Sequence, residues 1–311
     1  MNLSPPAAAA FRAHEPFLRA LLYRLTGSPA DAEDLVQETF GRLLADPPPD
    51  LEAPLRPWLT RVAVNLGRDL LRRRRREGYV GPWLPGPIET EALGPCAGDR
   101  YEVLESCTFA FLLALEALSP KQRAVLLLRD VFDHAVRETA EVLSISEADV
   151  KTTLHRARRA MAAYDRGRPT RAGLGARQLA ALQRFLAAVR SGDGAAAAAA
   201  LAEDAVLVND GGGDFVAARL PVVGRDPVAR FYLGLAKMAL PYAMEPRVLN
   251  GMPALVARWP DAPPPHAPLL VIRCEVDDTD RIRAIHAIAA TRKLAALQPP
   301  ADGPQSTRWN S

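Results

Sequence analysis

The stretch from Pro57 to Arg76 reads PWLTRVAVNLGRDLLRRRRR and combines a helical apolar pattern with a high density of arginine. Apolar residues recur every three or four positions, as on one face of an α-helix. They are Leu59, Val62, Ala63, Leu66 and Leu70. Between Arg56 and Arg76 the sequence holds eight arginines and one acid, Asp69. The pattern predicts a helix over residues 56–76 with one face in a core and a strongly basic opposite face.

A polar and basic row follows the predicted exposed face of this helix. Its members are Arg61, Asn65, Arg68, Arg72 and Arg75. Such a row suits a phosphate backbone, because each neutralised phosphate releases condensed counterions. Trp58 offers a ring for stacking on an unpaired base. The alternative is a solvated basic face with Trp58 in the core. Five consecutive arginines, 72–76, favour an anionic partner, since uncompensated like charges on a helix are unfavourable.

Two more helices are predicted before this one. The first has apolar residues at helical spacing, namely Phe17, Leu18, Leu21, Leu22 and Leu25. The second follows Ser28-Pro29, a favourable cap and first-turn pair. Its apolar stripe consists of Ala32, Leu35, Val36, Phe40, Leu43 and Leu44. Its exposed side carries Glu33, Asp34, Gln37, Glu38 and Gly41. Acids in a first turn are also common for dipole reasons alone.

A break and a second helical unit come next. Residues 78–101 lack periodicity and are rich in proline and glycine, which predicts a flexible linker. Helical periodicity returns over residues 102–165. Ser119-Pro120, with Gln122 at the capping-box position, predicts a helix start. A short helix at 136–143, a tight turn at 144–146 and a last helix then predict a helix-turn-helix.

The last helix of this unit has a basic exterior. Val150, Leu154, Ala157 and Met161 are expected to point inward. The outward residues are Glu147, Lys151, Thr152, His155, Arg156, Arg158 and Arg159. In a DNA-reading helix the N-terminal half reaches base edges, so Glu147, Lys151, Thr152 and His155 are candidates, whereas the later arginines would meet phosphates. An ordinary helical hairpin with a basic exterior is the alternative.

Residues 170–298 differ in kind and predict an α+β domain. A helix is expected around 176–190 and an alanine-rich helix over 194–202. Strands are expected at Ala205–Asn209, Arg247–Leu249, Ala254–Trp259, Leu269–Val276 and Ile282–Ala290. The tail, 299–311, is expected to be disordered.

Composition excludes several classes of protein. The formal net charge is only +3, with 49% hydrophobic residues. Cys96, Cys107 and Cys274 form no CxxC pair and no ligand spacing with histidines, which argues against structural zinc and a disulfide framework and fits a reducing cytoplasm. No apolar run reaches membrane-spanning length, and no signal peptide begins the chain. We therefore expect a soluble cytoplasmic protein without metal, cofactor or membrane attachment.

The two helical units together resemble the extracytoplasmic-function (ECF) sigma factors of bacterial RNA polymerase. Residues 31–40, DAEDLVQETF, resemble conserved region 2.2, and residues 57–76 resemble regions 2.3 and 2.4. Residues 118–123 and 145–159 resemble region 4. The resemblance implies two all-α sigma domains, region 2 over 1–77 and the region 4 helix-turn-helix over 102–165, joined by the linker 78–101.

The resemblance also implies a function and partners. The chain would direct promoter-specific transcription initiation as part of RNA polymerase. Asp34, Leu35, Gln37 and Glu38 would dock on the β′ clamp helices of the core enzyme, with the β flap as a further contact. The 46–57 loop and the following helix would read and open the −10 element, and the 146–159 helix would read the −35 element. Many relatives carry Arg where Thr153 stands, so the promoter sequence stays open, and no anti-sigma partner is evident.

Two short motifs resemble a sigma subgroup with a SnoaL-like C-terminal extension, an α+β cone of the ketosteroid-isomerase type. WLPGP at 83–87 and DGGGD at 210–214 stand where this subgroup has WLPEP and DGGGK, and AATRKL at 289–294 stands where it has NPDKL. Gly86 and Asp214 replace an acid and a lysine, so a charge pair at those two sites is absent. We expect the 170–300 domain to pack on the 78–90 linker and to hold the sigma units in a compact, less active arrangement. The contact residues would be Trp83, Leu84, Pro85, Asp210, Gly211, Gly212 and Gly213.

The extension is not expected to be an enzyme. His286, the best candidate base, shares a strand face with Ile282, Ala284 and Ile288, where a lone histidine is more often part of a wall. Arg273 and Glu275 suit a cross-strand surface pair. No set of base, acid and oxyanion donor is visible, and a small ligand in the cone is left open. The competing hypotheses are a helix-turn-helix repressor or activator that acts without polymerase, and an isomerase fused to a DNA-binding arm.

Overall fold

The computed structural model divides into two compact units, which are described separately. The first contains residues 1–78 and 88–168, and the second contains residues 79–87 and 169–311. The structure describes residues 5–50, 54–90, 105–166, 173–215, 217–238, 240–297 and 307–308. Most of the predicted linker beyond residue 90 and most of the predicted tail therefore lie outside the described residues.

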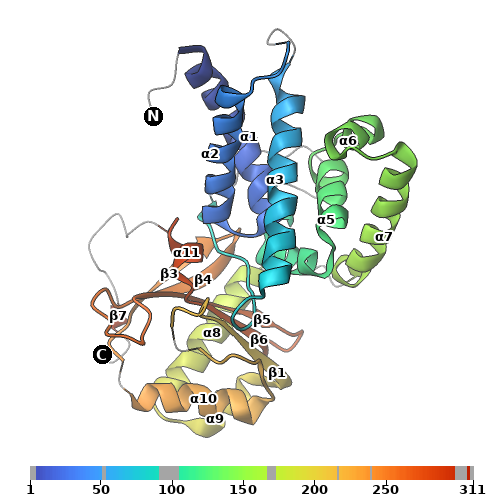
Figure 1. Cartoon of the computed structure of the whole chain (residues 1–311). Coiled ribbons are helices and arrows are strands. Elements are labelled where there is room, and N and C mark those ends of the chain that lie inside the picture. Colours follow the sequence, from blue (N-terminus) through green and yellow to red (C-terminus); the bar gives the residue numbers. More distant parts are fainter. Residues whose placement is uncertain are drawn as a thin grey trace. The chain divides into compact units, whose positions relative to one another are not determined.

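The first unit begins with three long helices that form the N-terminal bundle (Figure 1). They are α1 (Pro5–Thr26), α2 (Pro29–Ala45) and α3 (Leu55–Glu77). Ser28 caps α2 as predicted, its hydroxyl accepting a hydrogen bond from the Asp31 amide at 3.3 Å. The predicted apolar stripes of α1 and α2 are buried, except Leu44, which is 46% exposed. The 3.6-residue repeat of the helix carries Leu44 past the edge of the buried face. Thr39, which the apolar pattern did not include, is buried on that face.

A second set of helices forms the helix-turn-helix bundle of the same unit. It contains α4 (Phe109–Ala114), α5 (Pro120–Leu126), α6 (Val136–Leu143) and α7 (Glu147–Arg166). Short helical turns lie at η2 (Glu105–Cys107), η3 (Leu115–Ala117) and η4 (Leu127–Val131). The predicted capping box of Ser119 and Gln122 is present. Ser144, in the left-handed region at φ 53°, ends α6, and the four predicted inward residues of α7 are buried.

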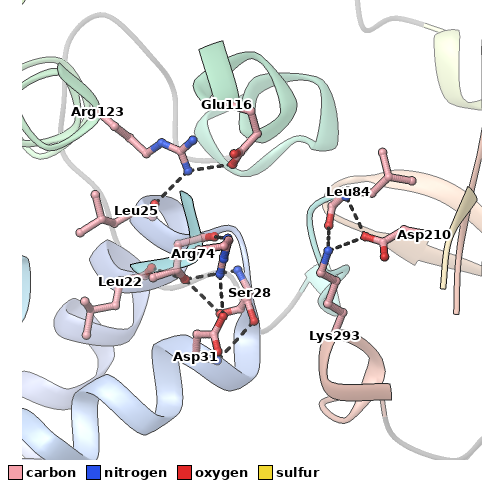
Figure 2. A network of polar contacts seen from close by, with 11 residues as sticks. Leu22, Leu25, Ser28, Asp31, Arg74, Leu84, Glu116, Arg123, Asp210 and Lys293 are labelled. Carbon is pink, nitrogen blue, oxygen red and sulfur yellow. Dashed lines mark hydrogen bonds and ion pairs between the residues drawn. The ribbon is translucent and has the colours of Figure 1, made fainter. Parts of the chain in front are cut away.

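The two bundles share one hydrophobic core. The Phe17 and Phe132 rings meet edge to face with centroids 5.4 Å apart. Arg123, only 2% exposed, donates hydrogen bonds to the Leu25 carbonyl at 3.0 Å and the Leu115 carbonyl at 2.8 Å. Figure 2 shows this guanidinium between Leu25 and Glu116. Because buried guanidinium groups require such partners, the bundles are locked together by polar as well as apolar contacts.

The second unit is a mixed sheet covered by helices (Figure 1). Within the described residues the strand order is β2-β1-β6-β5-β4-β3-β7, with β1 and β6 parallel and the other neighbours antiparallel. The strands are β1 (Leu201–Asp210), β2 (Val222–Val223), β3 (Ala243–Leu249), β4 (Met252–Arg258), β5 (Leu269–Val276), β6 (Ile282–Ile288) and β7 (Thr307–Arg308). The helices are α8 (Leu174–Arg190), α9 (Gly194–Ala199), α10 (Arg225–Lys237) and α11 (Thr291–Leu294).

Several predictions for this unit need correction. The alanine-rich helix ends at Ala199, and the chain enters β1 at Leu201. Helix α10 was not predicted, although Pro227 near its start and apolar residues at helical spacing are a signal for it. Residues 307–308 form a strand on β3, contrary to the expected disorder there.

The two faces of the sheet have different surroundings. One face, with Leu207, Ile272 and Ile285, packs against α8 and α10 in the second hydrophobic core. On the other face the strand register pairs Arg273 with His286, and both are buried. Arg273 is therefore not the surface residue that the sequence predicted. No helix in the described part of the chain is long and apolar enough to cross a membrane.

Candidate functional site

The predicted basic row on α3 is interrupted. Arg61, Arg72 and Arg75 are exposed, but Arg68 is only 9% exposed and donates to the Asn65 side-chain oxygen at 3.3 Å. Burial, with the nearby Arg72, lowers the pKa of Arg68. The prediction of a continuous exposed row is wrong at Arg68. Helix α3 packs against α1 and α2 of its own bundle and against α5 and α6 of the other, so the strip that faces solvent is narrow.

The arginine run at 72–76 is also better compensated than predicted. Arg72 pairs with Asp69 at 2.6 Å. Arg74 pairs with Asp31 at 2.8 Å and donates to the Thr26 carbonyl at 3.1 Å, as Figure 2 shows for the ion pair. Arg75 donates to a main-chain carbonyl, that of Leu118. The argument that the run is uncompensated is therefore wrong for these three arginines.

The N-terminal end of α3 faces the helix-turn-helix bundle. Trp58 is half-buried and packs against the shared core. Arg56 and Arg61 line a cavity of about 490 Å³ together with Glu138 and Glu141, which come from α6. The predicted −10 surface is thus partly turned toward acids of the other bundle.

The exposed side of α2 is acidic, as predicted. Asp34, Gln37 and Glu38 are exposed, and Glu38 pairs with Arg42 at 2.8 Å. Leu35 is instead 7% exposed and belongs to the core. Leu35 therefore helps to hold the bundle together, as the apolar stripe predicted, and its role in docking stays a prediction.

Helix α7 presents most of the predicted reading residues to solvent. Exposed on it are Glu147, Lys151, Thr152, His155, Arg156 and Arg159. Arg158 is exposed too, but its Nε and one terminal nitrogen, Nη2, donate to the Asp130 carboxylate at 2.9 and 2.6 Å. A guanidinium held by a buried carboxylate stabilises the fold, and its role at phosphates stays a prediction. Thr153, buried, donates to Asp149 at 3.1 Å.

In the second unit, the Asp210 carboxylate at the end of β1 binds the segment 79–87. One oxygen, Oδ1, accepts from the Tyr79 hydroxyl at 2.6 Å and from the Gly212 amide at 3.1 Å. The other, Oδ2, accepts from the Leu84 amide at 2.7 Å and from the Lys293 ammonium. With four donors this buried carboxylate is fully satisfied.

Lys293, in α11, completes this contact. Its Nζ donates to the Leu84 carbonyl at 2.6 Å and pairs with Asp210, as Figure 2 shows. The ammonium also lies 4.5 Å from the Tyr79 ring centroid and 4.1 Å from that of Trp83. We call Tyr79, Trp83, Leu84, Asp210 and Lys293 the latch. Tyr79 and Lys293 were missed from the sequence, although the lysine retained within AATRKL was an available signal.

The glycine loop after Asp210 lets the segment approach closely. Gly212 has φ +63°, and a Cβ atom on it would lie 2.8 Å from the Ala290 Cβ and 3.3 Å from the Tyr79 hydroxyl. Gly213 has φ +88°, and its Cβ would lie 3.3 Å from the Val80 Cβ. Gly212 and Gly213 therefore adjoin 79–87, whose Pro85 is buried, whereas Gly211 lies against Phe215 and Ala217 instead. The ion pair, however, joins Asp210 and Lys293, away from Gly86 and Asp214.

The helix-covered side of the sheet contains a cavity of about 400 Å³ within the second unit. Its wall is largely aromatic and aliphatic, with Asn209 and His266 among the few polar residues. His286 is outside this cavity, on the opposite face beside Arg273. Burial, aided by Arg273, lowers the pKa of His286 to about 3, so this histidine is neutral near pH 7.

We expect Arg158→Ala to destabilise the first unit by about 2–3 kcal/mol, since it leaves the buried Asp130 carboxylate without its bidentate partner. The neighbouring substitution Arg159→Ala is the control and should change stability by less than about 0.5 kcal/mol. Thermal and urea unfolding followed by circular dichroism measure both. Equal stabilities of the two variants would contradict the structural role of Arg158.

Gly212→Ala should destabilise the second unit more than Gly192→Ala. Both glycines have positive φ, but nothing lies within 4 Å of a Cβ on Gly192. The control therefore carries only the backbone strain of about 1–2 kcal/mol, whereas Gly212→Ala adds a clash of about 1–3 kcal/mol. Urea unfolding measures the difference, and a Gly192→Ala variant as unstable as Gly212→Ala would refute the close approach.

Known protein families match both bundles of the first unit. The family model for sigma-70 region 2 matches residues 10–77, and that for sigma-70 region 4 matches residues 108–161. The ECF RNA polymerase sigma factor SigJ of Mycobacterium tuberculosis (strain ATCC 25618 / H37Rv) is 38% identical over 234 residues, 73% of this chain and 72% of the relative. The ECF sigma factor SigG of Mycobacterium tuberculosis (strain CDC 1551 / Oshkosh) is 40% identical over 176 residues, 48% of this chain and 46% of the relative.

The likeness extends over the C-terminal unit. The crystal structure of Mycobacterium tuberculosis SigJ matches with a TM-score of 0.66 and 30% identity, covering 95% of this chain and 100% of that one. Regions 2 and 4 correspond to the N-terminal and helix-turn-helix bundles, and the mixed-sheet unit is SnoaL-like, as predicted. The chain belongs to the ECF RNA polymerase sigma factors, which direct transcription initiation at promoters.

Proposed function

We propose that this sigma factor is restrained in cis by its SnoaL-like unit, which withholds part of the tether between region 2 and region 4. One observation carries the proposal. Residues 79–87 follow region 2 directly along the chain, yet they belong to the second unit and are bound there by Asp210 and Lys293.

Promoter geometry explains why the tether matters. The −10 and −35 elements are about 25 base pairs apart, which at about 3.4 Å per step is on the order of 80 Å. Regions 2 and 4 share one core in the first unit and must separate to occupy both elements. Release of residues 79–87 lengthens the tether for that separation, so the latch favours the closed, less active state.

The DNA contacts follow from exposure and charge. For the −10 element we propose Trp58, Asn65 and the exposed arginines Arg61, Arg72 and Arg75, with Arg68 in a supporting role because it is buried. For the −35 element, Glu147, Lys151, Thr152 and His155 would meet base edges, and Arg156 and Arg159 would meet phosphates. The acids that face Arg61 from α6 support a closed state in which the −10 surface is partly covered.

The polymerase contact would be the exposed face of Asp34, Gln37 and Glu38 on α2, docking on the β′ clamp helices, with the β flap meeting region 4. Such work takes place in the cytoplasm, the compartment we propose for this protein. The SnoaL-like unit would be regulatory without catalysis. Its cavity carboxylate, Asp210, already accepts four hydrogen bonds and is therefore a poor general base.

Lys293→Met is expected to raise promoter-dependent transcription by about fivefold or more, because it breaks the latch while keeping the length of the side chain. Lys237→Met, on the exposed end of α10, is the matched control. Run-off transcription with purified core polymerase and full-length protein measures the effect. Circular dichroism checks that both variants are folded.

Equal transcription by Lys293→Met and Lys237→Met, with both folded, would overturn the proposal of restraint in cis. Lower transcription by Lys293→Met would also overturn it, because the latch would then support activity.

Glu38→Arg should weaken binding to core polymerase by about tenfold or more through charge reversal at the docking face. Its lost ion pair with Arg42 is exposed and contributes little to stability. Glu203→Arg, exposed in the second unit, is the control. Binding is measured by fluorescence anisotropy with labelled sigma factor. Unchanged affinity of Glu38→Arg would exclude this face as the docking site.

A further inference from the structure

We propose that the cavity of the SnoaL-like unit binds one small, neutral, ring-containing molecule with a single hydrogen-bonding oxygen, and that its occupation tightens the latch. The first part concerns the second unit alone. The second part rests on the proposed function, because it assumes that the latch governs the sigma factor.

The cavity has the size and lining of a ligand site. Its volume of about 400 Å³ falls within the range of about 300–1,000 Å³ that is typical of pockets for drug-sized molecules. Helix α10 contributes Phe231, Tyr232 and Leu235, and the sheet contributes Leu270 and Ile272. Aromatic and branched walls of this kind favour a flat apolar ring system.

A polar group in the wall gives the occupant its orientation. Asn209 lines the cavity, and within the described part of the chain its side-chain amide makes no hydrogen bond. Tyr232 also lines the cavity, and burial raises the pKa of its hydroxyl, which therefore stays protonated. Tyr242, by contrast, already donates to the Ala267 carbonyl at 2.7 Å. The Asn209 amide suits one ketone or hydroxyl oxygen of a ligand.

The charge at the wall selects a neutral occupant. Asp210 borders the cavity, but its carboxylate is already bound to Lys293 and to three further donors. An anionic ligand would gain no counter-charge there, because the ammonium of Lys293 is already paired with Asp210. A cationic ligand would compete with Lys293 and break the latch. Burying either charge unpaired is costly.

The wall of the cavity and the latch are parts of one short stretch of backbone. Asn209 precedes Asp210, whose carbonyl accepts from the Ala289 amide at 2.8 Å and the Ala290 amide at 3.2 Å. Ala289 also lines the cavity, and the Ala290 carbonyl accepts from the Lys293 amide at 3.0 Å. A ligand that fixes Asn209 and Ala289 therefore stabilises the positions of Asp210 and Lys293, and any such coupling is reciprocal.

The binding test uses 2-naphthol, a fluorescent ring compound that is neutral at pH 7, titrated into the full-length protein. We expect saturable one-to-one binding and about tenfold weaker binding of the anion 2-naphthoate. Asn209→Leu should weaken 2-naphthol about tenfold by removing its hydrogen bond. Ala287→Phe, which fills the cavity from β6, should abolish binding, whereas the exposed control Leu220→Phe should not. Unfolding curves verify that each variant is folded.

Absence of saturable binding to the wild type would overturn the site, and so would full binding to a folded Ala287→Phe variant. The coupling is read by hydrogen exchange of the Leu84 amide, which donates to Asp210. Saturating 2-naphthol should slow this exchange in the wild type and leave it unchanged in Lys293→Met, which should still bind the probe. Binding without any effect on Leu84 would overturn the coupling.

Unchanged transcription by Lys293→Met, with probe binding intact, would instead overturn the proposed function and leave the site standing.

Discussion

A buried ion pair between Asp210 and Lys293 holds the segment that connects the sigma regions. The two side chains are 0% and 6% exposed, and each is also bound to the main chain of Leu84. Breaking a buried pair by removing one partner costs about 3–5 kcal/mol, since the remaining charge is uncompensated. The aromatic rings of Tyr79 and Trp83 shield the ammonium further. The ion pair thus fixes Leu84 within residues 79–87, and we propose that it thereby limits the free length of the tether.

Arginine serves two distinct purposes in the first unit. Arg123 and Arg158 satisfy buried carbonyl or carboxylate groups and hold the helices together. Arg61 and Arg159 instead lie at the surface, where a guanidinium can meet DNA. The distinction matters for any account of promoter recognition, because only the second kind gains a partner when DNA binds.

Periodicity predicted most elements of both units, because burial on one side of a helix or strand leaves a regular apolar pattern. Leu44 and Arg68 were misjudged, since their exposure depends on the width of the contact with neighbouring helices. Lys293 was missed for a related reason: its partner Asp210 is 83 residues away in the chain, and local sequence carries no record of such a pairing. The motif around Asp210 located one half of the contact, and the structure supplied the other.

The most direct test measures the separation of the sigma regions when the latch is broken. Nitroxide labels at Arg42→Cys in α2 and Ala160→Cys in α7 report it by double electron–electron resonance, in a Cys96→Ser background; Cys107 and Cys274 are buried. The latch predicts one narrow distance distribution in the otherwise wild-type protein and an added longer, broader population in Lys293→Met. Identical distributions in the two proteins would contradict the claim that the SnoaL-like unit holds the sigma regions closed.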